Sequence, residues 1–525
     1  MKKILKSILL LCSSLMILLT SCEKFLEELP DNRAELDSEL KIKKLLVSAY
    51  SESAYVASAE YSSDNIDDYS ADNPYSDRLV EQLFRWQDVT ELANDGPKNV
   101  WEGCYKAIAS ANEALFAIEE LGSPSSLSAQ RGEALVARAY NHFILVNLFA
   151  QHYTKAFGDS DLGVTYMLEA EKTLNPKYER NSVKEVYEYI RKDLDEGLPL
   201  INDAAYSTPK FHFNRAAAYA LAARVALYMQ DWQKAVDYAT LAIGTDPRPL
   251  LRDNRWIRQN AIGEVHVVAR YYNSSSLKAN LMISTAYSIL GIYFGPYYGG
   301  GRFAHGSRIA TTETFSANGP YGPRASNGYI PMVYVYRAAN IDKYLVPRLT
   351  DDFEMTDPVA QTGFYHTVYA PFTTEETMLV RAEALIHLKR YDEAAVDMKR
   401  WVDNTLVTPP SVFDKNTIHS WATTIDYYTP AVPTAKKTLN PEFAIEAGMQ
   451  ESMIHALLFI RRLETMHTGL RWFDVKRYGI EVERRIITPA GITYEPSTKL
   501  TNRDNRAALQ LPADVISAGL TPNPR

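Results

Sequence analysis

Apolar side chains recur at helical spacing in two neighbouring segments of this chain. In each segment the larger side chains stand 4, 7 and 11 positions after the first, which places them along one face of an α-helix. They are Trp101, Tyr105, Ile108, Asn112 and Leu115 in the first segment, and Val136, Tyr140, Phe143 and Asn147 in the second. We predict two packed helices here. We expect both asparagines to hold backbone or helix contacts rather than a ligand.

Small residues define a sharper helical pattern farther along the chain. Ala223, Ala235 and Ala242 are separated by 12 and 7 positions, and Pro247 follows five positions later. Trp232 stands three positions before the second alanine. This spacing matches a tetratricopeptide helix pair, in which small side chains let two helices approach closely.

The same spacing recurs near the C-terminus. Ala382 and Ala394 are again 12 positions apart, and Tyr391 stands three positions before the second. We therefore predict several tetratricopeptide-like helix pairs, at about 98–150, 180–247 and 376–405. These ranges are not in tandem, so the chain is no plain solenoid.

Glycine, proline and tyrosine are concentrated between the helical regions. Glycines and prolines at 295–301 and 319–323 favour turns, and 61–86 is rich in Asp, Asn and Tyr. We predict loops and short strands rather than helices, in an irregular lobe at about 55–95 and 271–372. The expected fold class is mainly α, with tetratricopeptide-like helix pairs as a scaffold. Loops on such a scaffold are where ligands usually bind.

The N-terminus carries the pattern of a secretory signal. Three lysines lie within the first six positions, and the apolar run around them is short for a membrane span. The run ends in Leu-Thr-Ser-Cys at 19–22, which resembles a bacterial lipobox, in which the Cys is acylated and anchors the protein in a membrane. We predict a signal peptide at 1–21, a tether at 22–37 that is lipidated at Cys22, and a single domain at 38–525.

Composition narrows the class of protein. Of three Cys, only Cys104 remains in the mature domain, so no intramolecular disulfide can form. We expect Cys104 to be a small buried residue in a helix. The 46% hydrophobic and 23% charged content is that of a globular protein. The formal charge of −8 includes three lysines and no acid in the predicted leader, so the mature chain carries −11. An acidic chain without a basic run is a poor binder of nucleic acid.

No catalytic or metal-binding motif stands out. The ten histidines include no HExxH motif and no pair three or four positions apart. Asp351 and Asp352 could pair as in a glycosidase, which spacing alone does not show. The acidic cluster at 64–68 resembles calcium ligands, but it lacks the EF-hand glycine and distal Glu, so we expect a solvated loop. We predict no enzyme, no cofactor and no metal ligand.

A series of short motifs follows the lipobox along the chain: 101–112 (WEGCYKAIASAN), 134–149 (ALVARAYNHFILVNLF), 180–187 (RNSVKEVY), 214–231, 381–384 (RAEA), 469–477 (GLRWFDVKR) and 523–524 (NP). Taken in this order, they resemble the SusD/RagB family of nutrient-binding lipoproteins of Bacteroidetes. Each piece alone is weak, but the collinear series is specific. The segment 471–474 is shared across the family whatever the ligand, so we expect packing and a salt bridge there.

The resemblance implies a helical scaffold, an irregular lobe with the ligand site, and no catalysis. It also implies a lipid-anchored, surface-exposed place on the outer membrane. The partner would be a SusC-like TonB-dependent β-barrel transporter, on which the lipoprotein acts as a lid. Family ligands are mostly oligosaccharides, so we expect capture of an oligosaccharide for that transporter. The alternatives are RagB-like peptide capture, a surface-anchored hydrolase, and a scaffold that binds only protein.

We predict that aromatic side chains from two sequence-distant loops converge on the ligand. Tyr and Trp rings stack on sugar faces, while Asp, Asn and Arg bind hydroxyls. The candidates are Asp64, Asn65, Tyr69, Asn73, Tyr75 and Trp86 of the early loop, with Tyr297, Tyr298 and Arg302 of the glycine-rich loop. Taken singly, each aromatic among them is more often a core residue. The resemblance carries none of these residues over, because the site lies where family members differ most.

Overall fold

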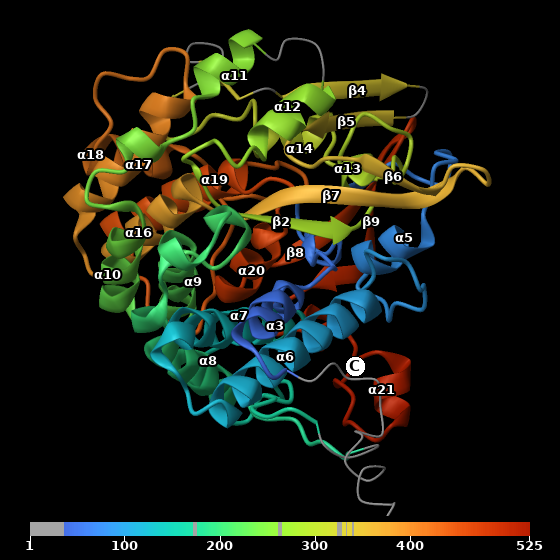
Figure 1. Ribbon diagram of the computed structural model, residues 1–525. Coiled ribbons are helices and arrows are strands. Elements are labelled where there is room, and N and C mark those ends of the chain that lie inside the picture. The colour runs from blue at the N-terminus through green and yellow to red at the C-terminus, as the bar shows by residue number, and fades with distance from the viewer. Residues whose placement is uncertain (1–35, 172–175, 261–264, 323–327, 332, 339–340) are drawn as a thin grey trace, which may run out of the picture.

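The computed structural model describes residues 36–171, 176–260, 265–322, 328–331, 333–338 and 341–525 (Figure 1). The predicted signal peptide, Cys22 and nearly all of the tether lie outside these residues. Long helices occupy the left and lower parts of Figure 1, and the strands lie at the upper right. The predicted fold class, mainly α with an irregular lobe, is therefore confirmed.

The scaffold consists of long helices that pack on their neighbours along the chain. They are α6 (Pro97–Glu120), α7 (Ser128–Phe149), α8 (Val183–Gly197), α9 (Arg215–Tyr228), α10 (Trp232–Ile243), α16 (Thr374–His387) and α17 (Tyr391–Thr405). Side chains define where several of them begin. Ser182 and Glu185 form a capping box at α8, and Asn214 and Asp231 cap α9 and α10.

Small side chains lie where paired helices meet. Ala223 of α9 and Ala235 of α10 are completely buried, as are Ala382 of α16 and Ala394 of α17. A methyl group is the whole side chain at these positions, so the facing helices can approach closely. Packed helices are present in all three ranges where the spacing predicted them.

The two tetratricopeptide-like pairs are neighbours in space although they are far apart in sequence. Arg381 of α16 pairs with Asp397 of α17 and also donates a hydrogen bond to the carbonyl of Gly244, 137 positions away, at 2.7 Å. Trp232 stacks on His387 with ring centroids 4.0 Å apart. Tertiary contacts therefore join α10 to α16 in one helical layer.

Both asparagines of the predicted helix faces hold the structure together. Asn112 donates to the carbonyls of Met167 and Glu169 at 3.0 and 3.1 Å. Asn147 donates to a carbonyl one turn earlier in α7 and accepts from the hydroxyl of Tyr187. The expectation that they serve backbone and helix contacts is confirmed.

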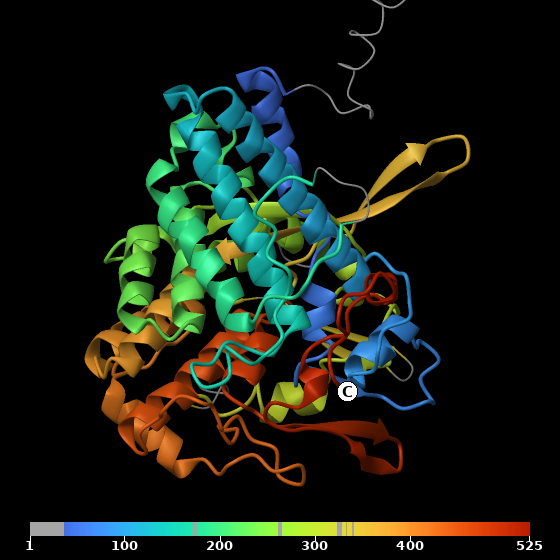
Figure 2. The same cartoon turned by 90° about the horizontal axis from the view of Figure 1, so that it is seen from below.

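Within the part of the chain that the structure describes, the irregular lobe contains three small sheets. Their strand orders are β3-β1-β8-β9, β2-β7-β6 and β4-β5. The strands are β1 (Asp67–Asp68), β2 (Asn280–Tyr287), β3 (Phe303–Ala304), β4 (Tyr334–Ala338), β5 (Ile341–Leu345), β6 (Asp352–Asp357), β7 (Thr362–Thr373), β8 (Val482–Thr488) and β9 (Gly491–Leu500). The β6–β7 hairpin projects from the body of the molecule (Figures 1 and 2).

Two features of this lobe differ from the prediction. Short helices lie in both parts of the region where we expected only loops and strands: α4 (Val56–Glu60), α5 (Arg78–Phe84), α13 (Leu290–Tyr293) and α14 (Ser307–Thr312). They are one or two turns long, too short to produce a helical period in the sequence. The β8–β9 hairpin brings C-terminal residues into the lobe, where β8 pairs with β1. That pairing links positions more than 400 residues apart, which no local pattern encodes.

Cys104 is buried in α6, as predicted. Burial raises the pKa of its thiol to about 12, so the side chain behaves as a small apolar residue. Among the described helices, none combines the length and the apolar composition needed to cross a membrane.

Candidate functional site

The two predicted loops lie side by side in the structure. The amide of Asn73 donates to the carbonyl of Gly301 at 3.2 Å, and the backbone N–H of Arg302 donates to the carbonyl of Tyr75 at 3.3 Å. The short strands β1 and β3 pair just beside them, with Asp67 opposite Ala304. The glycine-rich loop is therefore positioned by the early loop across more than 200 residues.

Three tyrosines form an aromatic surface where these loops meet, which we call the tyrosine cluster. The rings of Tyr75 and Tyr298 lie 4.5 Å apart, and Tyr336 of β4 stands edge-on to Tyr298 at 5.8 Å. Tyr75 is 36% exposed and Tyr298 is 48% exposed. Tyr336 was missed by the sequence analysis, although it lies in a run of alternating tyrosines, 334–336, that could have drawn attention to it.

Tyr297, the neighbour of Tyr298 in the same loop, contacts a different set of side chains. Its hydroxyl donates to the carboxylate of Asp351, which also binds the Nδ1 of His266 at 2.9 Å. Burial, followed by the hydrogen bond to Asp351, raises the pKa of Tyr297 above its usual value. The phenol therefore stays neutral and serves as a hydrogen-bond donor.

A buried lysine supports the glycine-rich loop from below. The Nζ of Lys343 donates to the carbonyls of Tyr297 at 3.0 Å and Gly299 at 3.2 Å. Burial lowers the pKa of this amine to about 7. Gly300 adopts a φ of +66°, and a Cβ there would lie 2.9 Å from the Tyr61 hydroxyl, so the turn requires glycine.

Trp86 and Asn65 do not belong to this surface, which corrects the prediction. Trp86 is only 3% exposed and donates its indole N–H to the carbonyl of Ser62 at 2.9 Å. Asn65 is completely buried, and its side-chain oxygen accepts from the Nε of Arg462 at 2.8 Å. Asn65 is thus held by Arg462 of the helix α19 (Met449–Glu464), while Trp86 lies under the guanidinium of Arg484 at 4.1 Å, so both side chains belong to the interior.

The acidic cluster at 64–68 is buried and ion-paired, so the expectation of a solvated loop is wrong. Each carboxylate faces an arginine: Asp64 pairs with Arg471, Asp67 with Arg485, and Asp68 with Arg302. Burial alone would raise the pKa of Asp64, but Arg462 and Arg471 together hold it well below its usual value. Asp64 is therefore a structural ion and not a surface ligand group.

Tyr69, Asn73 and Arg302 shape the site from behind. Arg302 gives two hydrogen bonds to Asp68, at 2.8 and 3.0 Å. The Tyr69 hydroxyl is buried against Gly306, where a Cβ would overlap it. Of the nine predicted ligand residues, Tyr75 and Tyr298 offer exposed rings, Tyr297 is half-buried beside them, and the other six are structural.

The segment 471–474 has the role expected of it. Trp472 is completely buried, Arg471 pairs with Asp64, and Asp474 accepts from Arg477 at 2.8 Å. The pair with Asp64 joins the helix α20 (Leu470–Arg477) to the lobe, and a salt bridge from Arg477 to Glu383 of α16 joins it to the scaffold. Packing and salt bridges therefore account for this motif.

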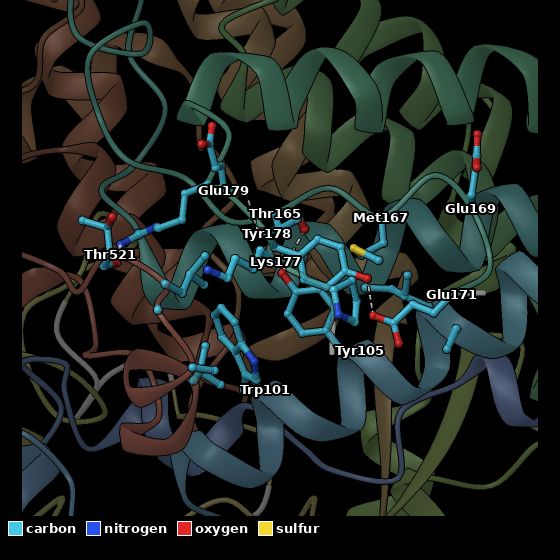
Figure 3. Close-up of a pocket in the computed structure, with 18 of the residues that line it drawn as sticks. Trp101, Tyr105, Thr165, Met167, Glu169, Glu171, Lys177, Tyr178, Glu179 and Thr521 are labelled. Carbon is cyan, nitrogen blue, oxygen red and sulfur yellow. Dashed lines mark hydrogen bonds between the residues drawn. The ribbon is translucent and has the colours of Figure 1, made fainter. Parts of the chain in front are cut away.

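A separate groove of about 760 Å³ runs beside α6, the segments 162–171 and 176–180, and the C-terminal helix α21 (Ala513–Ser517) (Figure 3). Its volume is in the range of ligand sites. Trp101 on its wall is only 6% exposed, and the hydroxyl of Tyr105 already donates a hydrogen bond to the Thr165 carbonyl. Tyr178 is the exposed ring here, and its hydroxyl donates to Glu171. The groove thus offers less free aromatic surface than the tyrosine cluster.

A family model described as "SusD-like_3: Starch-binding associating with outer membrane" matches residues 24–227. Among curated proteins, no sequence matches the chain.

Several crystal structures share the fold. One, from Bacteroides vulgatus, is provisionally named a sugar binding protein. It has 18% sequence identity and a TM-score of 0.64, and the alignment covers 94% of this chain and 99% of the other. A SusD superfamily protein of the same species has 19% sequence identity and a TM-score of 0.61, and the alignment covers 92% of this chain and 97% of the other. Another SusD superfamily protein, from Bacteroides thetaiotaomicron, has 19% sequence identity and a TM-score of 0.58, and the alignment covers 94% of this chain and 100% of the other.

Proposed function

We propose that this chain, whose residues 24–227 match a SusD-like family model and whose fold is shared by SusD superfamily proteins, is a SusD/RagB-type protein. It binds an oligosaccharide at the cell surface and passes it to a SusC-like TonB-dependent transporter. Lipidation at Cys22 would hold it on the outer membrane. The family description, which names starch binding and association with the outer membrane, supports the ligand class and the location.

The observation that carries this proposal is the tyrosine cluster. Tyr75 and Tyr298 present exposed rings at a junction of two loops, with Tyr336 set at an angle to them. Flat apolar faces with phenol hydroxyls at their edges suit the C–H faces and hydroxyls of sugars. The ion pairs beneath both loops hold these rings in place, so little ordering is needed on binding.

We further propose that the protein binds without catalysis. The two neighbouring aspartates that could resemble a glycosidase pair are each engaged separately. Asp351 binds His266 and Tyr297, while Asp352 pairs with Arg270 at 2.8 Å. Proteins of this family type are binding proteins, which agrees with that arrangement.

Calorimetry with the mature protein tests the ligand class. The probes are soluble starch, arabinoxylan, galactomannan and a tryptic digest of casein. We expect binding to a polysaccharide that weakens about tenfold or more in Tyr75→Ala/Tyr298→Ala, because two stacking contacts are lost. Binding of the peptide digest alone would favour the peptide alternative.

Two control variants locate the site. Tyr427→Ala removes an exposed tyrosine outside the cluster and should leave affinity unchanged. Tyr178→Ala removes the exposed ring of the groove in Figure 3. A loss of affinity in Tyr178→Ala, with none in the cluster variant, would move the site to the groove and contradict the proposal.

A further inference from the structure

The β6–β7 hairpin exposes an unusual amount of apolar surface for a segment that projects into solvent (Figure 2). Its large exposed side chains are Phe353, Met355, Val359, Phe364 and Tyr365, from 39% to 95% exposed. A two-stranded hairpin gains little stability from such residues in water. Concentrated exposed apolar surface of this kind marks a binding surface.

The strand register divides these side chains between two faces. Phe353 of β6 lies directly opposite Tyr365 of β7, and their rings are 5.0 Å apart. Phe364 is on the other face, where it meets Tyr287 of β2 at 5.9 Å. Because side chains alternate along a strand, Tyr365 shares its face with Thr367 and thus with the side of β7 that packs on the body.

The Phe353–Tyr365 face adjoins the proposed ligand site. Tyr297 neighbours Tyr298 of the tyrosine cluster, and its hydroxyl donates to Asp351, two positions before Phe353. The nearby Tyr365 hydroxyl also contributes to the raised pKa of Tyr297. His266, whose side chain is 42% exposed, binds the same aspartate. One hydrogen-bonded link therefore connects the two aromatic surfaces.

We propose that Phe353 and Tyr365 form a second stacking surface for the same oligosaccharide, which we call the hairpin subsite. This inference rests on the proposed function and deepens it, because it assigns the protein a preference for longer chains. The tyrosine cluster holds one part of the glycan, and the hairpin subsite stacks on sugar units farther along. The Tyr297–Asp351–His266 group lies between them and offers hydrogen bonds to hydroxyls.

The geometry favours a glycan over a protein on this face. The surface is linked to the loop of the tyrosine cluster by the hydrogen bond from Tyr297 to Asp351, and its two rings, 5.0 Å apart on neighbouring strands, offer apolar faces on which sugars can stack. Self-pairing through the β6 edge is opposed by Glu354 and Asp357, since like charges at an edge strand repel a second copy.

Oligosaccharides of two lengths test the hairpin subsite by calorimetry on the mature protein. The probes are the three-unit and seven-unit oligosaccharides of whichever polysaccharide the wild type binds, for starch maltotriose and maltoheptaose. In Phe353→Ala/Tyr365→Ala we expect the Kd of the seven-unit chain to rise about tenfold, while that of the three-unit chain stays unchanged. Tyr75→Ala/Tyr298→Ala should weaken both.

The matched control is Tyr287→Ala/Phe364→Ala, which removes two exposed rings from the opposite face of the hairpin and should change neither Kd. Phe353→Leu/Tyr365→Leu keeps apolar side chains on both strands and should reproduce the loss, which separates stacking from folding.

Equal effects on both lengths, no effect on the longer chain, or a loss in the opposite-face control would overturn the subsite. Loss in the hairpin variant alone, with the cluster variant unaffected, would instead overturn the proposed site at Tyr75 and Tyr298. If no probe binds the wild type, both proposals fall together.

Discussion

Arg471 gives two hydrogen bonds to the carboxylate of Asp64, at 2.7 and 2.8 Å, across 407 positions of the chain. Both side chains are buried, and Arg462 and Lys437 approach the same carboxylate. This pair joins a helix near the C-terminus to the loop that carries Tyr75. The position of the candidate ligand surface thus depends on a contact between the two ends of the domain.

Replacing Asp64 with Asn should strongly destabilise the protein. The change leaves the Arg471 guanidinium buried without its counter-charge, which costs about 3–5 kcal/mol. Urea unfolding of the mature protein measures the effect. Glu52→Gln is the control, because the Glu52–Lys106 pair is mostly exposed and should contribute less than about 1 kcal/mol. Equal effects of the two substitutions would show that the buried pair has no special role.

Ala235→Trp should destabilise the scaffold by about 1–3 kcal/mol, because the methyl group is completely buried in a helix that packs on α9 and α16, which leaves no room for an indole. Thermal unfolding followed by circular dichroism measures this. Leu241→Trp introduces the same ring at a position of α10 that is 52% exposed, and it should have little effect. A melting temperature of Ala235→Trp equal to that of the wild type would contradict close packing of this helix pair.

Lys343 should make stability depend on pH in a defined window. Its pKa is lowered by burial from 10.5 to about 7, so between these values the unfolded chain holds a proton that the folded chain has released. The contribution of Lys343 to stability therefore rises with pH above about 7 and is constant below it.

The comparison that isolates this residue is wild type against Lys343→Met. Between pH 7 and 9.5, the free energy of unfolding of the wild type should rise by roughly 3 kcal/mol more than that of the variant. Other buried amines, such as Lys476, titrate in both proteins and cancel in the difference. Urea unfolding at several pH values provides the data, and parallel pH profiles would be evidence against the shifted amine.

Cys22→Ala should release the protein from the membrane fraction and abolish labelling with palmitate, because the thiol is the predicted acylation site. Fractionation of cells grown with labelled palmitate tests this. Cys104→Ala is the matched control, since that thiol is buried in α6 and should leave both anchoring and labelling intact. Label retained in the Cys22 variant would mean that the lipobox assignment is wrong.

Local patterns were sufficient for the helical part of this protein. The spacing of Ala223, Ala235 and Trp232 predicted a helix pair because close helix contacts need small residues at fixed intervals, and such intervals are visible in sequence. The roles of Asn112 and Asn147 followed from their place on an apolar helix face, where a polar side chain must find a buried partner.

The lobe was decided by the tertiary structure. The sequence indicated that Asp64 belongs to a solvated acidic loop, because its partner Arg471 lies on a helix far along the chain. A carboxylate can be buried only where such a counter-charge lies close to it in the folded structure. For the same reason Trp86 became a core residue and Tyr336 joined Tyr298 at the surface. The sequence by itself determined which segments form helices, since that depends on neighbours within a few positions. Which tyrosines face solvent together depended on contacts between distant segments, which only the folded chain brings about.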